Sequence, residues 1–128
     1  MKFAILHHDA CGASRHHYRI DDSGAREVLR GETEPGELPQ CIDIVLSGDA
    51  DQHAPEPAQL DALRTLLREL KLRYPDIAVG GHRQIRGQRT TCPGRYFPLT
   101  ELRDWSASEL LVERDAALQD IVDRQYRP

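Results

Sequence analysis

The residues of this chain that could do chemistry together are histidines and one cysteine. They are the pairs His7-His8 and His16-His17 near the start of the 128-residue chain, and then His82 and Cys92 in the stretch GGHRQIRGQRTTCPG. Neutral imidazole and cysteine thiolate are preferred zinc ligands, and a site with three of them leaves a fourth position for water. Such water ionises near neutral pH and can attack a polarised carbonyl. These residue types therefore indicate a hydrolytic zinc centre.

The spacing of these residues is a weak signal when taken alone. Nine residues separate His82 from Cys92, which is not the spacing of a known zinc knuckle such as CxxC. Within the pair at the start, successive strand residues point to opposite faces, so only one of His7 and His8 can face a metal. The elements that carry these side chains therefore decide whether they meet.

Apolar runs and turn residues predict an α/β chain of strands and helices. We expect strands at residues 2–8, 16–21, 25–30, 41–47 and 77–81, the second and third forming a hairpin. A helix is predicted over residues 57–74, where Leu60, Leu63, Leu67 and Leu70 form one apolar stripe. The strand–helix–strand order favours a crossover connection and at least one parallel pair.

This arrangement can bring the zinc ligands together. If the first strand and the strand before His82 are parallel neighbours, their carboxyl ends place His7 and His82 at one edge of the sheet. The loop that follows can then fold back and add Cys92.

A further helix is expected at the end of the chain. Ser106 and Glu109 have the spacing of a capping box, and apolar residues share a broad face from there to about Gln125. We therefore divide the chain into a compact domain, residues 1–105, and a C-terminal helix, residues 106–128. The helix either packs on the sheet or forms a homodimer contact.

Composition limits the partners and the compartment. The net charge of −4 gives no general attraction to nucleic acid, and no apolar run reaches the roughly 18 residues that cross a membrane. Three cysteines, an odd number, argue against a disulfide framework. The first residues lack the apolar region of a signal peptide, so we expect a protein that is cytoplasmic until released, or exported by a non-classical route.

Five stretches resemble, in order, the zinc amidase family that includes N-acetylmuramoyl-L-alanine amidases, phage lysozyme-type amidases and peptidoglycan recognition proteins. The most specific is GHRQIRGQRTTCPGRYF, which is similar to the family's Gly-His-Arg, loop, Thr-x-Cys-Pro-Gly signature. The supporting stretches are AILHHDA, HHYRIDDSG, CIDIVLSGD and PAQLDALRTLLRELKLRYP. The resemblance covers about residues 3–105.

The resemblance implies a mixed central sheet flanked by helices, together with one Zn²⁺. It also implies hydrolysis of the amide between N-acetylmuramic acid and L-alanine, with peptidoglycan or muropeptide as the partner. Carried over by position, His7, His82 and Cys92 are the zinc ligands. Thr90 falls where the family places a Lys or Thr that assists the tetrahedral intermediate. His16 falls where the family has an active-site Tyr.

Two departures from the family leave alternatives open. The family has a long segment with a helix between the first strand and the hairpin, whereas residues 9–15 form only a tight loop here. In place of the family's Tyr, His16 could act as acid or base, or could be an extra ligand. The chain could therefore bind muropeptide without hydrolysis, or could be a zinc hydrolase of a different small amide.

The other chemistry-bearing residues are assigned structural places. Cys11 is expected to be a loop thiol, although it could approach the zinc as a competing ligand. We expect Arg83 to pair with a carboxylate of the fold. The remaining expectations are a structural role for His17, a place for His8 on the face opposite the zinc, a buried core position for Cys41, and solvent exposure for His53.

Overall fold

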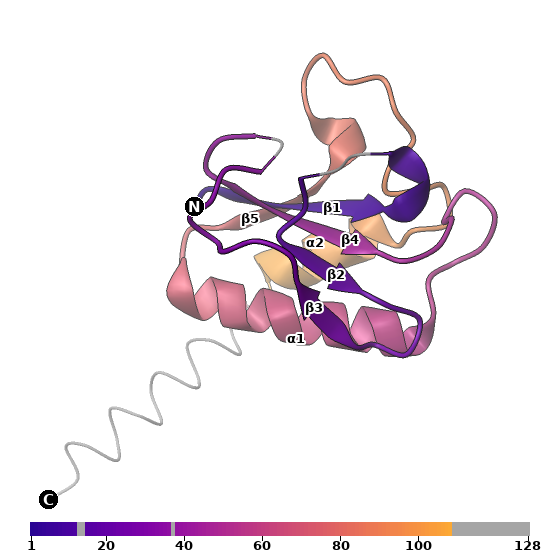
Figure 1. Cartoon of the computed structure of the whole chain (residues 1–128), viewed down its shortest axis with the longest axis horizontal. Coiled ribbons are helices and arrows are strands. Elements are labelled where there is room, and N and C mark those ends of the chain that lie inside the picture. Colours follow the sequence, from indigo (N-terminus) through magenta and orange to yellow (C-terminus); the bar gives the residue numbers. More distant parts are fainter. Residues whose placement is uncertain (13–14, 37, 109–128) are drawn as a thin grey trace, which may run out of the picture.

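The computed structural model describes residues 1–12, 15–36 and 38–108, and it contains one five-stranded sheet with two α-helices (Figure 1). The strands are β1 (Phe3–His8), β2 (Tyr18–Ile20), β3 (Arg26–Val28), β4 (Cys41–Leu46) and β5 (Ala78–Gly81). The helices are α1 (Pro57–Arg73) and α2 (Leu99–Ala107), and short 3-10 turns η1 (Asp9–Cys11) and η2 (His82–Gln84) follow β1 and β5. The expected mixed sheet with flanking helices is confirmed.

The sheet order is β3-β2-β4-β1-β5, with an antiparallel β2–β3 pair and parallel pairing elsewhere. Helix α1 connects β4 to β5. In the sheet, β1 lies between these two strands. In the β1–β5 pair, Leu6 is in register with Gly81. His7 and His82 therefore leave neighbouring strands at the same edge, as predicted.

Helix α1 forms where the leucine period predicts it. Pro57 occupies its first turn, and the Gln59 side chain accepts the Glu56 backbone N–H at 2.9 Å, as in a capping box. The fully buried leucines are Leu63, Leu66, Leu67 and Leu70, whereas Leu60 is only partly buried. The apolar stripe is thus rotated slightly from the predicted one.

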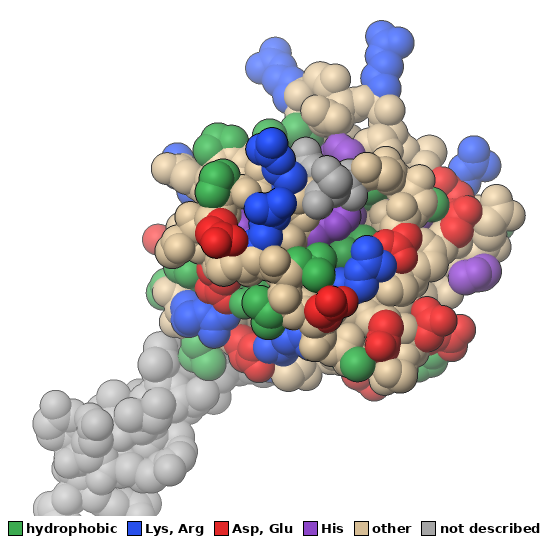
Figure 2. All heavy atoms as spheres, viewed as in Figure 1, with side chains coloured by type: hydrophobic (Ala, Val, Ile, Leu, Met, Phe, Trp, Pro, Cys, Tyr) green, Lys and Arg blue, Asp and Glu red, His purple; other side chains and the backbone are tan. Residues whose placement is uncertain are grey.

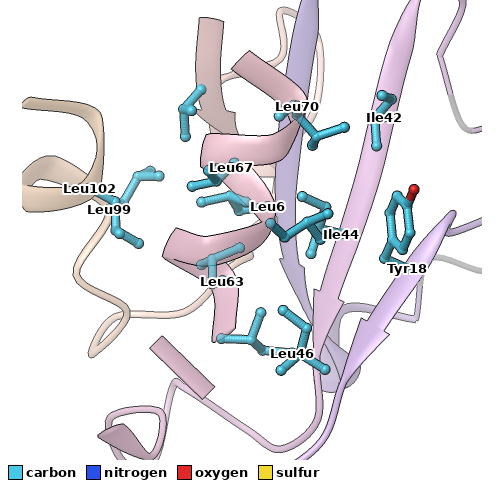
Figure 3. Packing of buried hydrophobic residues seen from close by; sticks show 14 of the residues in the cluster. Leu6, Tyr18, Ile42, Ile44, Leu46, Leu63, Leu67, Leu70, Leu99 and Leu102 are labelled. Atoms are coloured by element: carbon cyan, nitrogen blue, oxygen red, sulfur yellow. The ribbon is translucent and has the colours of Figure 1, made fainter. Parts of the chain in front are cut away.

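Helix α2 was not expected from the sequence. Its Leu99 and Leu102 pack in the same core as the α1 leucines and Ile44 of the sheet (Figure 3). The Arg68 guanidinium of α1 also lies over the Trp105 ring, 5.3 Å from its centroid. Both described helices therefore cover the same face of the sheet.

The predicted capping role of Ser106 is wrong, because this residue lies in the last turn of α2 and its hydroxyl donates to the Arg103 carbonyl at 3.0 Å. The rest of the expected C-terminal helix, residues 109–128, lies outside the described residues. The division into 1–105 and 106–128 and the homodimer contact therefore stay predictions. No helix in the described part of the chain is long and apolar enough to cross a membrane.

Candidate metal centre

Four candidate ligands meet at the carboxyl ends of β1 and β5. One donor atom from each of His7, Cys11, His82 and Cys92 lies within 4.8 Å of all the others. The Nδ1 atom of His7 is 3.7 Å from the Cys92 sulfur and 3.8 Å from the Cys11 sulfur. The three ligands expected from the sequence are therefore brought together, and Cys11 joins them.

His7 is oriented by a carboxylate on the neighbouring strand. Its Nε2–H donates to Asp43 Oδ1 at 2.8 Å, and both side chains are almost completely buried. Because a carboxylate only accepts, this bond leaves the lone pair of His7 on Nδ1, which faces the two sulfurs. Burial alone would lower the pKa of His7, but its hydrogen bonds with Asp43 and Cys11 outweigh burial and raise that pKa.

His82 is held in the same way by a different acceptor. Its Nε2 lies 3.2 Å from the side-chain oxygen of Gln88, whereas its buried Nδ1 has no hydrogen-bond partner within the described structure. A buried imidazole nitrogen without a partner costs free energy, and a metal ion would remove that cost. His82 therefore offers Nδ1, as His7 does.

Cys92 is buried on the loop after β5. Its backbone N–H donates to Thr90 Oγ1 at 3.1 Å, and its carbonyl accepts the Arg83 N–H at 2.8 Å. The hydrogen bond with Cys11 and burial both raise the pKa of the Cys92 thiol. Binding of zinc would displace the proton from this sulfur, because the thiolate is the form that ligates.

The donor set fits zinc in chemistry and in spacing. Tetrahedral zinc with Zn–S bonds of about 2.3 Å and Zn–N bonds of about 2.05 Å separates sulfur from nitrogen by about 3.5 Å. The two nitrogen–sulfur distances of 3.7 and 3.8 Å are close to that separation. Acceptors that fix both histidine rings, Asp43 and Gln88, complete the pattern typical of zinc sites.

The two predicted catalytic residues lie beside this cluster. The His16 ring centroid is 4.8 Å from that of His7, and its buried Nε2 has no partner within the described part of the chain. Burial and the neighbouring His7 lower the pKa of His16, so its neutral form is favoured. Thr90 is placed beside Cys92 by the hydrogen bond that it accepts.

The expectations for four other residues are confirmed. His17 is fully buried, with Nε2 at 2.8 Å from the Glu34 carbonyl and Nδ1 accepting the Asp43 N–H at 2.9 Å, which confirms its structural role. His8 faces away from the cluster and accepts the Ala50 N–H at 3.0 Å. Cys41 is buried and His53 is exposed, as predicted.

The predicted ion pair of Arg83 is wrong. Its guanidinium donates to the carbonyls of Gly94 at 3.0 Å and of Thr91 at 3.5 Å. In this tight turn the Thr91 carbonyl accepts the Gly94 N–H at 2.7 Å and the Gly94 carbonyl accepts the Phe97 N–H at 3.2 Å. Each carbonyl oxygen has a second lone pair, which accepts from the guanidinium. Arg83 thus fixes the loop that carries Cys92.

The cluster lies at the bottom of a small hollow of about 240 Å³. His7, Cys11 and His82 line it together with Gly12, Leu38, Ile85 and Gln88. On the face shown in Figure 2, histidine atoms show as small patches between other side chains, apart from one prominent group at the right-hand edge. A reacting group can therefore reach the donor atoms from one side.

Comparison with known proteins now identifies the family. The sequence model described as N-acetylmuramoyl-L-alanine amidase, Amidase_2, matches residues 1–95. The chain belongs to this family. No curated protein matches the chain, so the solved structures give the remaining comparison for this Amidase_2 member.

Three solved structures share the fold. The N-acetylmuramoyl-L-alanine amidase LysC from Clostridium intestinale is 23% identical over 80% of this chain and 83% of its own, with a TM-score of 0.69. A mutant of Drosophila PGRP-LB in complex with tracheal cytotoxin is 23% identical over 80% of each chain, with a TM-score of 0.68. AmpD is 18% identical over 80% of this chain and 83% of its own, with a TM-score of 0.65. At these identities they establish the Amidase_2 fold of this chain.

Sequence reasoning missed two parts of the candidate metal centre and left a third open. Asp43 carried a signal, because a charged residue inside the apolar run CIDIVLS is rarely buried without a partner. Gln88 carried none, since its role depends on the path of the loop after η2. Cys11 was expected to be a loop thiol, whereas the structure brings its sulfur to the donor cluster.

Proposed function

We propose that the chain is a zinc-dependent amidase that hydrolyses the bond between N-acetylmuramic acid and L-alanine in peptidoglycan. The observation that carries this proposal is the convergence of the donor atoms of His7, His82 and Cys92 at one edge of the sheet. Membership in the family described as N-acetylmuramoyl-L-alanine amidase supports the bond that is cut. The complex of Drosophila PGRP-LB with tracheal cytotoxin supports a ligand bound on this fold.

His7, His82 and Cys92 would hold the ion, and Asp43 and Gln88 keep the two histidines in the tautomer that offers Nδ1. Zinc bound there would polarise the amide carbonyl and lower the pKa of water. These two hydrogen bonds restrain both rings, which supports zinc binding at Nδ1.

His16 and Thr90 would serve the substrate. The buried Nε2 of His16, next to His7, accepts a proton from the attacking water and returns it to the leaving amine nitrogen. The Thr90 oxygen already accepts the Cys92 N–H, so its hydroxyl hydrogen can donate to the substrate carbonyl oxygen as negative charge develops.

The test is metal content combined with hydrolysis of peptidoglycan, measured as release of L-alanine N-termini with and without chelator. We expect one zinc per chain and hydrolysis that stops in chelator. His82→Ala should lose both zinc and hydrolysis, whereas His16→Ala should keep zinc and lose about 100-fold or more in rate. The exposed residue His53 gives the control His53→Ala. Hydrolysis that persists in chelator, or in His82→Ala, would overturn the proposal.

A second function is favoured by the position of Cys11. A fourth protein donor would close the metal site, and the chain would then bind muropeptide without cutting it. Zinc-loaded protein that binds muropeptide but releases no L-alanine N-termini, even after long incubation, would establish this function. The small volume of the hollow favours a third function, the hydrolysis of a small amide.

A further inference from the structure

The sulfur of Cys11 cannot be distinguished from that of Cys92 by its distance to His7. The two sulfur–Nδ1 distances are 3.8 and 3.7 Å, and both sulfurs belong to the group of four donor atoms within 4.8 Å. Two nitrogens and two sulfurs are one of the common ligand sets of closed tetrahedral zinc sites. The chain thus brings together one more candidate zinc ligand than a hydrolytic site needs.

The short connection after β1 explains why Cys11 lies there. The chain turns immediately after His8 into η1, and Gly12 ends this turn in the left-handed region with φ of 75°. The Asp9 carboxylate, at the start of η1, pairs with Arg19 of β2 at 2.8 Å. This turn carries Cys11 back over His7, four residues earlier. A long segment at this point would carry the chain away from the cluster.

The two cysteines differ in how firmly they are held. Cys92 is completely buried, and its backbone bonds to Thr90 and Arg83 on both sides. Cys11 is partly exposed, at the wall of the hollow through which a reacting group would arrive. His82 is partly exposed and lines the same hollow, but its ring is held by Gln88. Of the two cysteines, Cys11 is therefore the one on the open side.

We propose that Cys11 is a fourth zinc ligand that occupies the position needed for hydrolysis and must leave it before substrate can react. The inference rests on the proposed zinc amidase function, and it assigns to this chain an internal inhibitor of its own site. When Cys11 leaves, it takes up a proton and stays in the hollow as a thiol. Structural zinc sites have four protein ligands, whereas catalytic sites keep one position open. Binding of Cys11 therefore gives this site the ligand set of a structural one.

The effect on rate follows from the fraction of molecules in which the position is open. If Cys11 occupies it nine-tenths of the time, only about a tenth of the molecules are competent, and removing Cys11 raises the rate about tenfold. Affinity for the metal should change in the opposite direction. Loss of a ligand should weaken zinc binding at least as much as loss of a supporting residue, by about 10- to 100-fold.

The experiment compares wild type with Cys11→Ala and with the control Cys41→Ala, which removes a buried thiol far from the cluster. Each protein is loaded with Co²⁺, and the thiolate-to-cobalt absorbance in the near ultraviolet is measured per bound ion. Zinc affinity is measured by competition with a chromogenic chelator, and peptidoglycan hydrolysis by release of L-alanine N-termini. We expect Cys11→Ala to lose about half the absorbance, to bind zinc more weakly and to hydrolyse about ten times faster. Cys41→Ala should match wild type.

The outcomes separate this inference from the proposed function. Half the cobalt absorbance and weaker zinc binding in Cys11→Ala, without hydrolysis by any variant, would support the fourth ligand and overturn the amidase. Equal absorbance and affinity in wild type and Cys11→Ala would overturn the fourth ligand, and chelator-sensitive hydrolysis would still establish the amidase. A wild-type protein that binds neither Co²⁺ nor Zn²⁺, or that contains a Cys11–Cys92 disulfide, would also overturn the fourth ligand.

Discussion

Asp43→Asn tests whether the buried carboxylate prepares His7 for zinc. The substitution keeps the size of the side chain but removes its charge, at a place where the Asp43 oxygen accepts the His7 Nε2–H at 2.8 Å. If the amide oxygen replaces the carboxylate oxygen, the hydrogen bond remains but loses its charge assistance, which roughly halves its strength. If the amide NH₂ turns toward His7, Nε2 must accept. The ring proton then moves to Nδ1, the atom that faces the sulfurs.

Both orientations of the amide weaken zinc binding. In the second orientation Nδ1 of His7 carries the ring proton and cannot bind zinc. Residues that support a ligand in this way contribute about 10- to 100-fold in metal affinity, which corresponds to about 1.4–2.8 kcal/mol. We therefore expect the dissociation constant for zinc to rise by that factor in Asp43→Asn. Hydrolysis at a fixed, limiting zinc concentration should fall in proportion.

The assay is competition for zinc with a chromogenic chelator, at pH 7.5 and in reducing buffer. The matched control is Asp76→Asn, which removes the same charge from an exposed position outside the cluster. Urea unfolding of the metal-free proteins shows whether Asp43→Asn still folds. A folded Asp43→Asn protein that binds zinc within twofold of wild type would refute the tautomer argument, because the carboxylate would then be dispensable.

Three further predictions concern the frame around the site. A Cβ on Gly36 would lie 2.3 Å from Asp43 Oδ2, so Gly36→Ala should destabilise the fold by about 1–3 kcal/mol in urea unfolding and weaken zinc binding. Burial raises the pKa of Glu32, but hydrogen bonds from Arg73 and Tyr18 outweigh it, and the net shift is downward. Its contribution to stability is therefore present above the ordinary pKa of 4.5 and is lost as the pH falls through the lower folded value. Glu32→Gln should accordingly lose stability at pH 7 but differ less from wild type at pH 3 in urea unfolding; an equal difference at both values would contradict this. Leu67→Ala, in the core under the sheet, should cost about 2–5 kcal/mol by the same assay without changing zinc affinity per folded molecule.

Helices and strands with a regular spacing of apolar residues were predictable from the sequence. Short segments in which polar and apolar residues alternate irregularly were not. The leucine spacing of α1 and the apolar runs of β1 and β4 predicted their places to within a residue or two. Helix α2 was missed because LTELRDWSA has only two apolar residues at helical spacing before Trp105 and follows a proline. Its position is decided by packing of Leu99 and Leu102 against the core, which is a tertiary effect.

The residues of the site that strands position were predictable, whereas those on loops were harder to place. His7 lies near the end of β1 and His82 directly follows β5, its parallel neighbour. The register Leu6–Gly81 brings them together without any detail of side chains. The Cys92 assignment came from the family resemblance of the loop. The position of Cys11 depends on a single 3-10 turn whose direction no periodic pattern encodes, so the sequence left open whether this thiol reaches the cluster.

Several hydrogen bonds fix the loop that carries Cys92. The Asp51 carboxylate accepts the Thr91 hydroxyl at 2.7 Å and the Arg95 N–H at 3.0 Å, which joins the loop to the segment after β4. At Gly94, a Cβ would lie 2.5 Å from the backbone of Ala50, so the two segments are in direct contact. Moving Cys92 would break all of these contacts, whereas moving Cys11 would disturb one partly exposed turn and its Asp9–Arg19 ion pair. Of the two cysteines, Cys11 is therefore the one whose displacement costs less free energy, which is the property that a displaceable ligand requires.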